Sequence, residues 1–182
     1  MARAALRGVL GDALNLAPAA VAFDYGPHGK PALAGPLTGA GLAFNLSHSG
    51  TLALVGLVHH GEIGVDVEAH RHTTDRDAVV RRFFSAAENA AYFELPAEDR
   101  LRGFFDCWCR KEAVVKALGR GLGFPLGDFD VSLAPSPGRL VRLQDAAGTE
   151  SGWCLAGFEP AAGYSSAVVV QGRDCRLSRV SA

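Results

Sequence analysis

Hydrophobic residues recur with helical spacing at the start of the chain and with strand spacing soon after it. Leu6, Val9, Leu10 and Leu14 follow the i, i+3, i+4 pattern, which predicts an amphipathic helix over residues 2–14. The segment "PAAVAFDYGPHGKPAL" predicts a short strand and a Gly/Pro-rich turn. Further strands are expected in "LAFNLSHSG", whose SHS residues would lie in a polar turn, in "TLALVGLV" (51–58) and in "EIGVDVE" (62–68).

The pattern changes to helical spacing near residue 70 and returns to strands near the end of the chain. "TTDRDAVVRRFF" and "SAAENAAYFEL" are helical in pattern, and Ser85 with Glu88 forms an S-x-x-E capping box. A longer helix is predicted from about 97 to 118, ending before Gly119. Four apolar runs follow as expected strands: "FDVSL", "RLVRL", "WCLAGF" and "SSAVVV". This order predicts the α+β class.

Composition narrows the classes of protein to consider. The 182 residues are 48% hydrophobic and 20% charged, with a net charge of −1, so we expect a globular fold without bulk electrostatic affinity for nucleic acid. No run reaches the roughly 18 apolar residues of a membrane span. Arg7 and Asp12 interrupt the N-terminal apolar run, which favours an amphipathic helix over a signal peptide. We therefore expect a cytoplasmic location.

The four cysteines do not suggest a metal clamp. Cys107 and Cys109 are two apart on a predicted helix, so their thiols would point about 200° apart. Reduced, buried cysteines are the better interpretation.

The first candidate for chemistry is "GVDVE". On a strand, Asp66 and Glu68 project from the same face, where two carboxylates repel each other unless a cation lies between them. Oxygen ligands of this kind suit Mg²⁺. The alternative is an ordinary edge strand with an acidic face in solvent.

The second candidate lies in "FFDCWCRKEAVVKALGRGL". Five residues fall within roughly 100° of one helix face: Phe105, Trp108, Cys109, Glu112 and Lys116. Glu112 and Lys116 could be a routine surface ion pair worth a few tenths of a kcal/mol. The aromatic neighbours instead indicate a buried face or a cleft, with Lys111 on its flank.

Two weaker candidates contain residues suited to phosphate. Ser47, His48 and Ser49 could hold phosphate oxygens, although a single histidine in a turn is usually a surface residue. "GPHGKP" has part of a P-loop but lacks G-x-x-x-x-G-K-[ST].

Taken together and in this order, "GKP", "FNLSHSG", "GVDVE", "FFSAAE" and "WCRKEAVVKALGRGL" resemble a 4′-phosphopantetheinyl transferase of the surfactin-synthetase-activating (Sfp) type. The resemblance runs from about Arg3 to the last strands. It implies two similar α+β lobes related by a pseudo-twofold axis, with coenzyme A between them. The lobes would be residues 1–62, shortened at the N-terminus, and residues 63–182.

The resemblance also implies a reaction and roles for individual residues. Such enzymes move the phosphopantetheine arm of coenzyme A to a serine of an acyl or peptidyl carrier protein, with Mg²⁺, and release adenosine 3′,5′-bisphosphate. Asp66, Glu68 and Glu112 would hold the Mg²⁺. Glu112 would also be the general base, directly or through a metal-bound water, and Lys116 would hold the phosphates.

Other matched residues would bind coenzyme A. Ser47 and His48 would contact its phosphates, His48 as part of the catalytic set, while Gly29, Lys30 and Pro31 would line the adenine pocket. Lys111 would add supporting charge. Glu88 matches a recurrent acid of the family, but its capping-box position gives it an equally good structural role.

The resemblance has one departure. Members of this type usually carry a further segment before the helix that starts here at Arg3, including basic residues for the 3′-phosphate, which leaves Arg3 and Arg7 as candidates. We therefore expect a monomer with weakened coenzyme A affinity, or self-association over exposed apolar surface. The alternatives are a truncated, non-catalytic relative that binds coenzyme A or a carrier protein, and a generic structural α+β domain.

Overall fold

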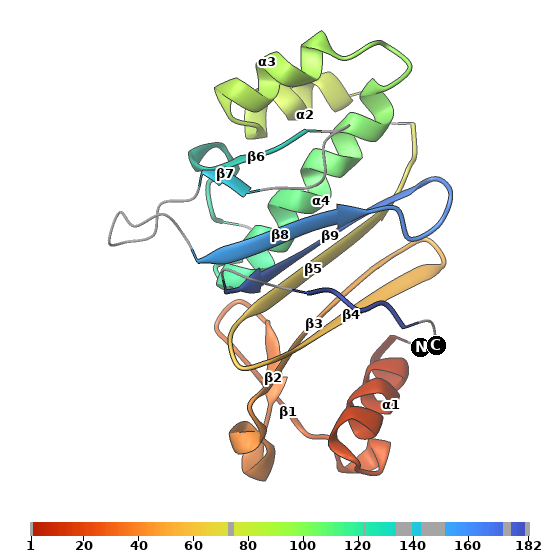
Figure 1. Cartoon of the computed structure of the whole chain (residues 1–182), viewed down its shortest axis with the longest axis vertical. Coiled ribbons are helices and arrows are strands. Elements are labelled where there is room, and N and C mark those ends of the chain that lie inside the picture. The colour runs from red at the N-terminus through yellow and green to blue at the C-terminus, as the bar shows by residue number, and fades with distance from the viewer. Residues whose placement is uncertain are drawn as a thin grey trace.

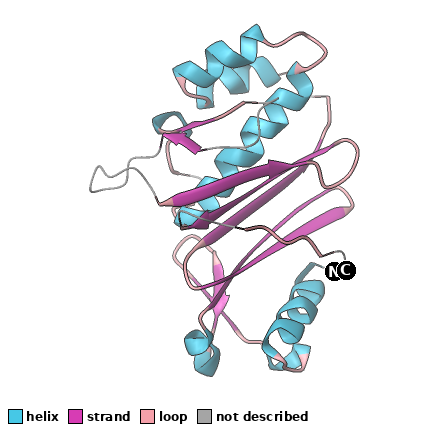
Figure 2. Cartoon of the chain, in the orientation of Figure 1, coloured by secondary structure: helices cyan, strands magenta, loops and turns pink. Residues whose placement is uncertain are grey.

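The computed structural model describes residues 2–72, 75–121, 123–133, 140–142, 152–172 and 176–180. Helices and antiparallel strands are both present, and helices flank the strands rather than alternating with them (Figures 1 and 2), which confirms the predicted α+β class. Among the described residues, no helix combines the length and apolarity that a membrane span requires.

The first half of the chain contains one helix, two short strands and a long hairpin. These elements are α1 (Ala2–Leu14), β1 (Phe23–Tyr25), β2 (Pro31–Leu33), β3 (Leu42–Ser49) and β4 (Leu52–His59), with 3₁₀ turns at Pro18–Ala20 and Gly35–Ala40. The apolar stripe of α1 is buried through Leu6 and Leu10 against Val21, Leu33 and Phe44. The predicted helix over residues 2–14 is thus confirmed.

The second half surrounds one long helix. Its elements are β5 (Ile63–Ala69), α2 (Arg76–Phe83), α3 (Ala86–Glu94), α4 (Arg100–Leu118), a 3₁₀ turn at Leu126–Asp128, β6 (Asp130–Val131), β7 (Leu140–Arg142), β8 (Trp153–Phe158) and β9 (Tyr164–Gln171). β5, β9 and β8 form an antiparallel sheet in that order, and α4 packs across it (Figure 1). Each half therefore sets a helix beside antiparallel strands, while the pseudo-twofold relation and the boundary at residue 62 remain predictions.

Local signals in the sequence explain how the helices begin and end. The capping box at α3 is formed in both directions: Glu88 N donates to Ser85 Oγ at 3.2 Å, and Ser85 N donates to the Glu88 carboxylate at 2.9 Å. α4 ends at Gly119, which adopts a left-handed conformation with φ 65°. The start of α4 was predicted too early, because residues 96–99 form a separate turn closed by a bond from Asp99 N to Pro96 O.

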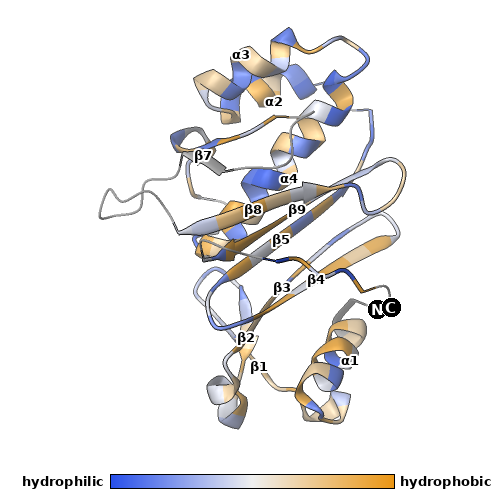
Figure 3. Ribbon diagram, viewed as in Figure 1, coloured by the Kyte–Doolittle hydropathy of each residue, from blue (hydrophilic) through white to orange (hydrophobic). Residues whose placement is uncertain are grey.

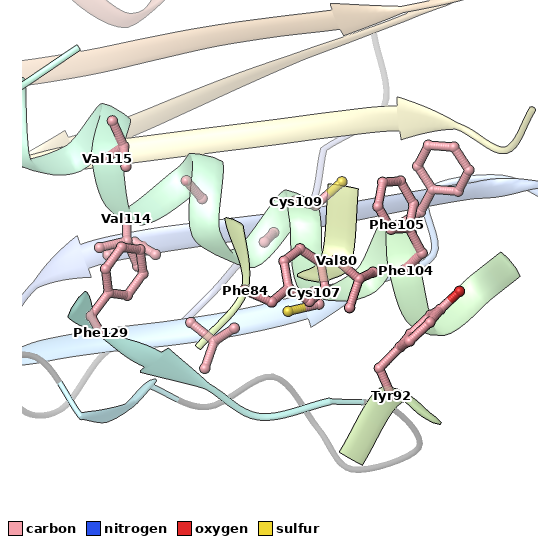
Figure 4. Packing of buried hydrophobic residues seen from close by; sticks show 14 of the residues in the cluster. Val80, Phe84, Tyr92, Phe104, Phe105, Cys107, Cys109, Val114, Val115 and Phe129 are labelled. Atoms are coloured by element: carbon pink, nitrogen blue, oxygen red, sulfur yellow. The ribbon is translucent and has the colours of Figure 1, made fainter. Parts of the chain in front are cut away.

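The largest hydrophobic core lies around α4. It combines α4 with side chains of α2, α3, β6 and β9, including Val80, Phe84, Cys107 and Phe129 (Figure 4). Figure 3 shows hydrophobic residues along β4 and β9 as well. A second cluster joins β4 to β5 and β9, where Gly56 lets the strands approach because a Cβ there would lie 2.8 Å from Ile63 Cδ1.

Two further expectations can be compared with the structure. Ser47, His48 and Ser49 do not lie in a turn after the strand, since β3 continues through Ser49 and the turn begins at Gly50, with φ 57°. Cys107 and Cys109 are free thiols buried on α4, as expected.

Candidate functional site

The candidate site lies where the acidic face of β5 meets α4. Alternation along β5 turns Gly64, Asp66 and Glu68 toward α4 and the intervening valines toward β4. A Cβ at position 64 would overlap the carbonyl oxygen of Ala113 and the backbone nitrogen of Ala117. Glycine therefore allows α4 to lie directly on the strand and brings its polar side chains to the acids.

Asp66 is the central acid of this site. Its side chain is nearly enclosed, and Oδ1 accepts hydrogen bonds from Lys116 Nζ at 2.6 Å and from Ser47 Oγ at 2.9 Å. Oδ2 is buried and accepts no hydrogen bond from the described residues. The nearby Cys109 thiol donates instead to the Ser165 carbonyl, at 3.3 Å. One oxygen of Asp66 thus has unused capacity to bind a cation or donor.

Glu112 joins the cluster from α4. It is only 9% exposed, and burial raises the pKa of its carboxyl group above the usual value. The Asp66 carboxylate raises this pKa further, Lys116 lowers it and Glu68 raises it. Glu68 itself accepts a hydrogen bond from Ser49 Oγ at 2.8 Å. The three acids predicted from the sequence therefore influence one another across β5 and α4.

The chemistry of this cluster suits a hard divalent cation. Three carboxylates supply oxygen donors, and one buried oxygen of Asp66 is unpaired. Burial and, after it, repulsion from Asp66 and Glu68 raise the pKa of Glu112, and a cation would relieve that repulsion. Across the described ranges, however, no three acidic, histidine or cysteine side chains are already arranged as a metal-ligand group. Lys116 lies against Asp66 instead.

Lys111 does not belong to this site, which corrects its expected role in binding coenzyme A. Its ammonium group is fully buried and pairs with Glu88 at 2.7 Å. It also donates to the carbonyl oxygens of Leu126 and Phe129, at 2.6 and 2.9 Å. Glu88 completes the pair by accepting from Val131 N at 2.8 Å. Both residues are structural, and they anchor the segment after α4.

The "GKP" turn lies beside the C-terminal end of α4. Lys30 Nζ donates to Glu62 at 2.6 Å and to the Ala117 carbonyl at 3.1 Å, which joins the first half of the chain to the end of the helix. Gly29 has φ 78° and open space around it, and Pro31 begins β2. Their contact with adenine remains a prediction.

The other predicted coenzyme A residues lie in different surroundings. His48 is exposed, whereas its neighbour Ser47 on the same strand is buried against Asp66, so the two side chains leave β3 on opposite faces. The Arg7 guanidinium donates to the Val21 and Pro18 carbonyl oxygens and packs over Phe23. In this structure it therefore binds groups of the protein itself. The side chain of Arg3 lies outside the described part of the chain.

Sequence reasoning missed Gly64 and Asn45, which build the site, and it considered Ser49 only as a phosphate ligand. Gly64 sets the approach of α4, while Asn45 and Ser49 bind β5 from β3. The available signal was the alternation N-x-S-x-S, twenty residues before V-D-V-E-A. Trp108 was placed on the site face, but it packs against Phe83 of α2 and Phe104.

Comparison with known proteins places these residues in a family. The sequence profile of the 4′-phosphopantetheinyl transferase superfamily matches residues 62–169, which include all three acids. The 4′-phosphopantetheinyl transferase HetI of Nostoc sp. is 37% identical over 93% of this chain and 69% of its own length. Psf-1 of Bacillus pumilus is 37% identical over 56% of this chain, and AcpT of Salmonella typhimurium is 39% identical over 62%.

The chain spans only about half the length of some relatives, 42% of psf-1 and 56% of AcpT. Among solved structures, the holo-[acyl-carrier-protein] synthase of Thermotoga maritima aligns with a TM-score of 0.49 and 19% identity, over 62% of this chain and 64% of its own. The extent of the profile match and the identity to HetI are decisive: this chain belongs to the 4′-phosphopantetheinyl transferase superfamily.

Proposed function

We propose that this protein transfers the 4′-phosphopantetheine arm of coenzyme A to a serine hydroxyl of an acyl or peptidyl carrier protein. The serine oxygen forms a bond to the phosphorus that carries the pantetheine arm. The pyrophosphate bond breaks, and adenosine 3′,5′-bisphosphate leaves with the bridging oxygen. Family membership and the names of the relatives support this reaction class.

The observation that carries the proposal is the meeting of Asp66 with Lys116 and Glu112. These groups come from a strand and a helix far apart in sequence, and they combine buried negative charge with a lysine 2.6 Å from Asp66. A site that binds a pyrophosphate and removes a proton needs a cation, a base and an enclosed position. A purely structural acidic face in solvent would not bury Asp66 and Glu112.

We assign Asp66, Glu68 and Glu112 as the residues that would hold Mg²⁺. The ion would neutralise charge on the pyrophosphate oxygens as the bond breaks. Glu112 accepts the proton of the carrier serine, directly or through a water molecule. A bound cation would lower the pKa of the Glu112 carboxyl group, so the route through a water molecule is chemically the easier of the two.

Lys116 is assigned to the phosphates of coenzyme A. Its side chain is 29% exposed, so it can reach a ligand at the edge of the cluster while Asp66 holds it in place. Gly29, Lys30 and Pro31 remain assigned to the adenine end, and His48 to the solvent-facing side of the phosphates. We place the reaction in the cytoplasm, where coenzyme A and carrier proteins meet.

A carrier-loading assay tests this function. The protein is incubated with coenzyme A, MgCl₂ and an apo carrier protein, and the carrier is then weighed by mass spectrometry. A mass gain of one phosphopantetheine group, lost when EDTA replaces MgCl₂, is the expected result. No gain with several acyl and peptidyl carriers, together with retained coenzyme A binding, would indicate the non-catalytic binding protein instead.

A further inference from the structure

β5 has backbone amides on one edge that its partner strand does not use. The register with β9 pairs residues 63–69 along one side of β5, and alternation leaves the N–H groups of Val65, Val67 and Ala69 on the other side. No described strand is hydrogen-bonded to β5 there, since its sheet runs β5-β9-β8. Unpaired amides in the buried interior would be costly.

Side chains of β3 take the place of a strand at this edge. Val65 N donates to Asn45 Oδ1 at 2.9 Å, Val67 N to Ser47 Oγ at 3.3 Å, and Ala69 N to Ser49 Oγ at 3.0 Å. The offset is twenty residues each time, so β3 and β5 run in parallel in this region, side by side as Figure 1 shows. We call Asn45, Ser47 and Ser49 the β3 ladder.

The two hydroxyl groups of the β3 ladder also contact the acids. Ser47 Oγ donates to Asp66 Oδ1 at 2.9 Å, and Ser49 Oγ donates to Glu68 Oε2 at 2.8 Å. Each serine therefore binds the backbone of β5 on one side and a carboxylate on the other. Both are buried, with 7% and 8% exposure, so water does not compete freely for these bonds.

Ser47 has no hydrogen-bonding capacity left. A hydroxyl group has one proton and two lone pairs. Here the proton goes to Asp66, and the oxygen accepts from Val67 N and from Lys116 Nζ, the latter at 3.0 Å. To donate to a phosphate oxygen, Ser47 would have to release Asp66.

We propose that Ser47 and Ser49 are positioning residues that fix the Asp66 and Glu68 carboxylates against β5. The proposal rests on the proposed function for its catalytic consequence, but the hydrogen bonds that carry it exist without any ligand. It gives the first half of the chain a defined part in the site: β3 holds the acids that α4 completes.

Hydrogen exchange of the ligand-free protein tests the ladder independently of activity. In Ser47→Ala the amide of Val67, and in Ser49→Ala the amide of Ala69, should exchange roughly tenfold faster. In both serine variants the amides of Asp66 and Glu68, on the edge facing β9, should keep their exchange rates. Thr38→Ala, which removes an exposed hydroxyl group elsewhere, should leave the exchange rates of all four amides unchanged. Circular dichroism verifies folding, and Ser47→Thr and Ser49→Thr, which keep the hydroxyl, should restore the rates.

Kinetics and metal binding then distinguish positioning from ligand binding. Ser47→Ala and Ser49→Ala should lower kcat and the affinity for Mn²⁺, measured by electron paramagnetic resonance, by about 10–100-fold, with the KM for coenzyme A within about twofold. A raised KM for coenzyme A with unchanged kcat and unchanged Val67 exchange would overturn the proposal for Ser47. If the unmodified protein loads no carrier, the proposed function fails, and the exchange rates still decide whether the β3 ladder exists.

Discussion

The backbone of Gly64 on β5 lies directly against the carbonyl group of Ala113 on α4, with no room for a side chain between them. The same approach places Lys116, one turn farther along α4, at Asp66, two residues along β5. The site therefore depends on a contact between a strand and a helix that carries no chemistry of its own. Substitutions at Gly64 can measure how much this contact tolerates.

Gly64→Ala should destabilise the fold by about 1–3 kcal/mol, because the added methyl group would push against backbone atoms that cannot rotate away. Urea unfolding followed by circular dichroism measures the change. Gly8→Ala is the matched control: its Cβ meets nothing within 4 Å inside α1, so it should be neutral or stabilise by up to about 1 kcal/mol. Equal effects of the two substitutions would contradict the close approach at Gly64.

Lys111→Met should destabilise the fold by about 3–5 kcal/mol, because it leaves the Glu88 carboxylate buried without its cation. Lys30→Met removes a cation from the more exposed pair with Glu62 and should cost no more than about 1 kcal/mol. The same unfolding experiment compares them. A Lys111→Met protein that is as stable as the unmodified chain would restore Lys111 as a candidate ligand.

Lys116→Met should lower the rate of carrier loading by about 10²–10³-fold, since it removes the cation beside Asp66 that we assign to the phosphates. Lys116→Arg keeps the charge and should retain more activity. Mass spectrometry of the carrier gives the rates, and circular dichroism checks the fold. Loading at an unchanged rate in Lys116→Met would remove this residue from the mechanism.

Cys107 and Cys109 should resist alkylation by iodoacetamide at pH 8 in the folded protein. Burial raises the pKa of both thiols well above the usual value, and neighbouring carboxylates, Glu88 for Cys107 and Asp66 for Cys109, raise it further. Little reactive thiolate is therefore present. Peptide mapping should find both labelled only in denaturant; rapid labelling of either one in the native state would contradict its burial.

Much of the fold follows from local signals that the sequence displays. The stripe of Leu6 and Leu10 predicts α1, and the capping box predicts the start of α3. The sequence also predicts that the GVDVE strand and the Lys-Glu helix contribute to one site. The motifs and the chemistry of the side chains both indicate three acids and a lysine there. The helix signals lie within short segments of the chain. The acids of the site are recognisable because few structural roles require several carboxylates close together.

The remaining features depend on contacts between distant elements. Lys111 and Lys116 were both expected to serve the same cleft, yet one is enclosed with Glu88 and the other meets Asp66, because α4 is covered on nearly every side. Ser47 was expected in a turn, yet β3 extends through it and its hydroxyl group binds the backbone of β5. Neither outcome is encoded in the spacing of the residues themselves.

The most direct test of the central claim is carrier loading by Glu112→Gln, measured beside the unmodified protein with coenzyme A and MgCl₂. The substitution keeps size and removes the charge that would accept the serine proton and bind the cation. If Asp66, Glu68, Glu112 and Lys116 form one transfer site, the unmodified protein adds one phosphopantetheine group to the carrier, and Glu112→Gln, still folded, adds none. Loading by Glu112→Gln at the unmodified rate would show that the chemistry takes place without this carboxylate.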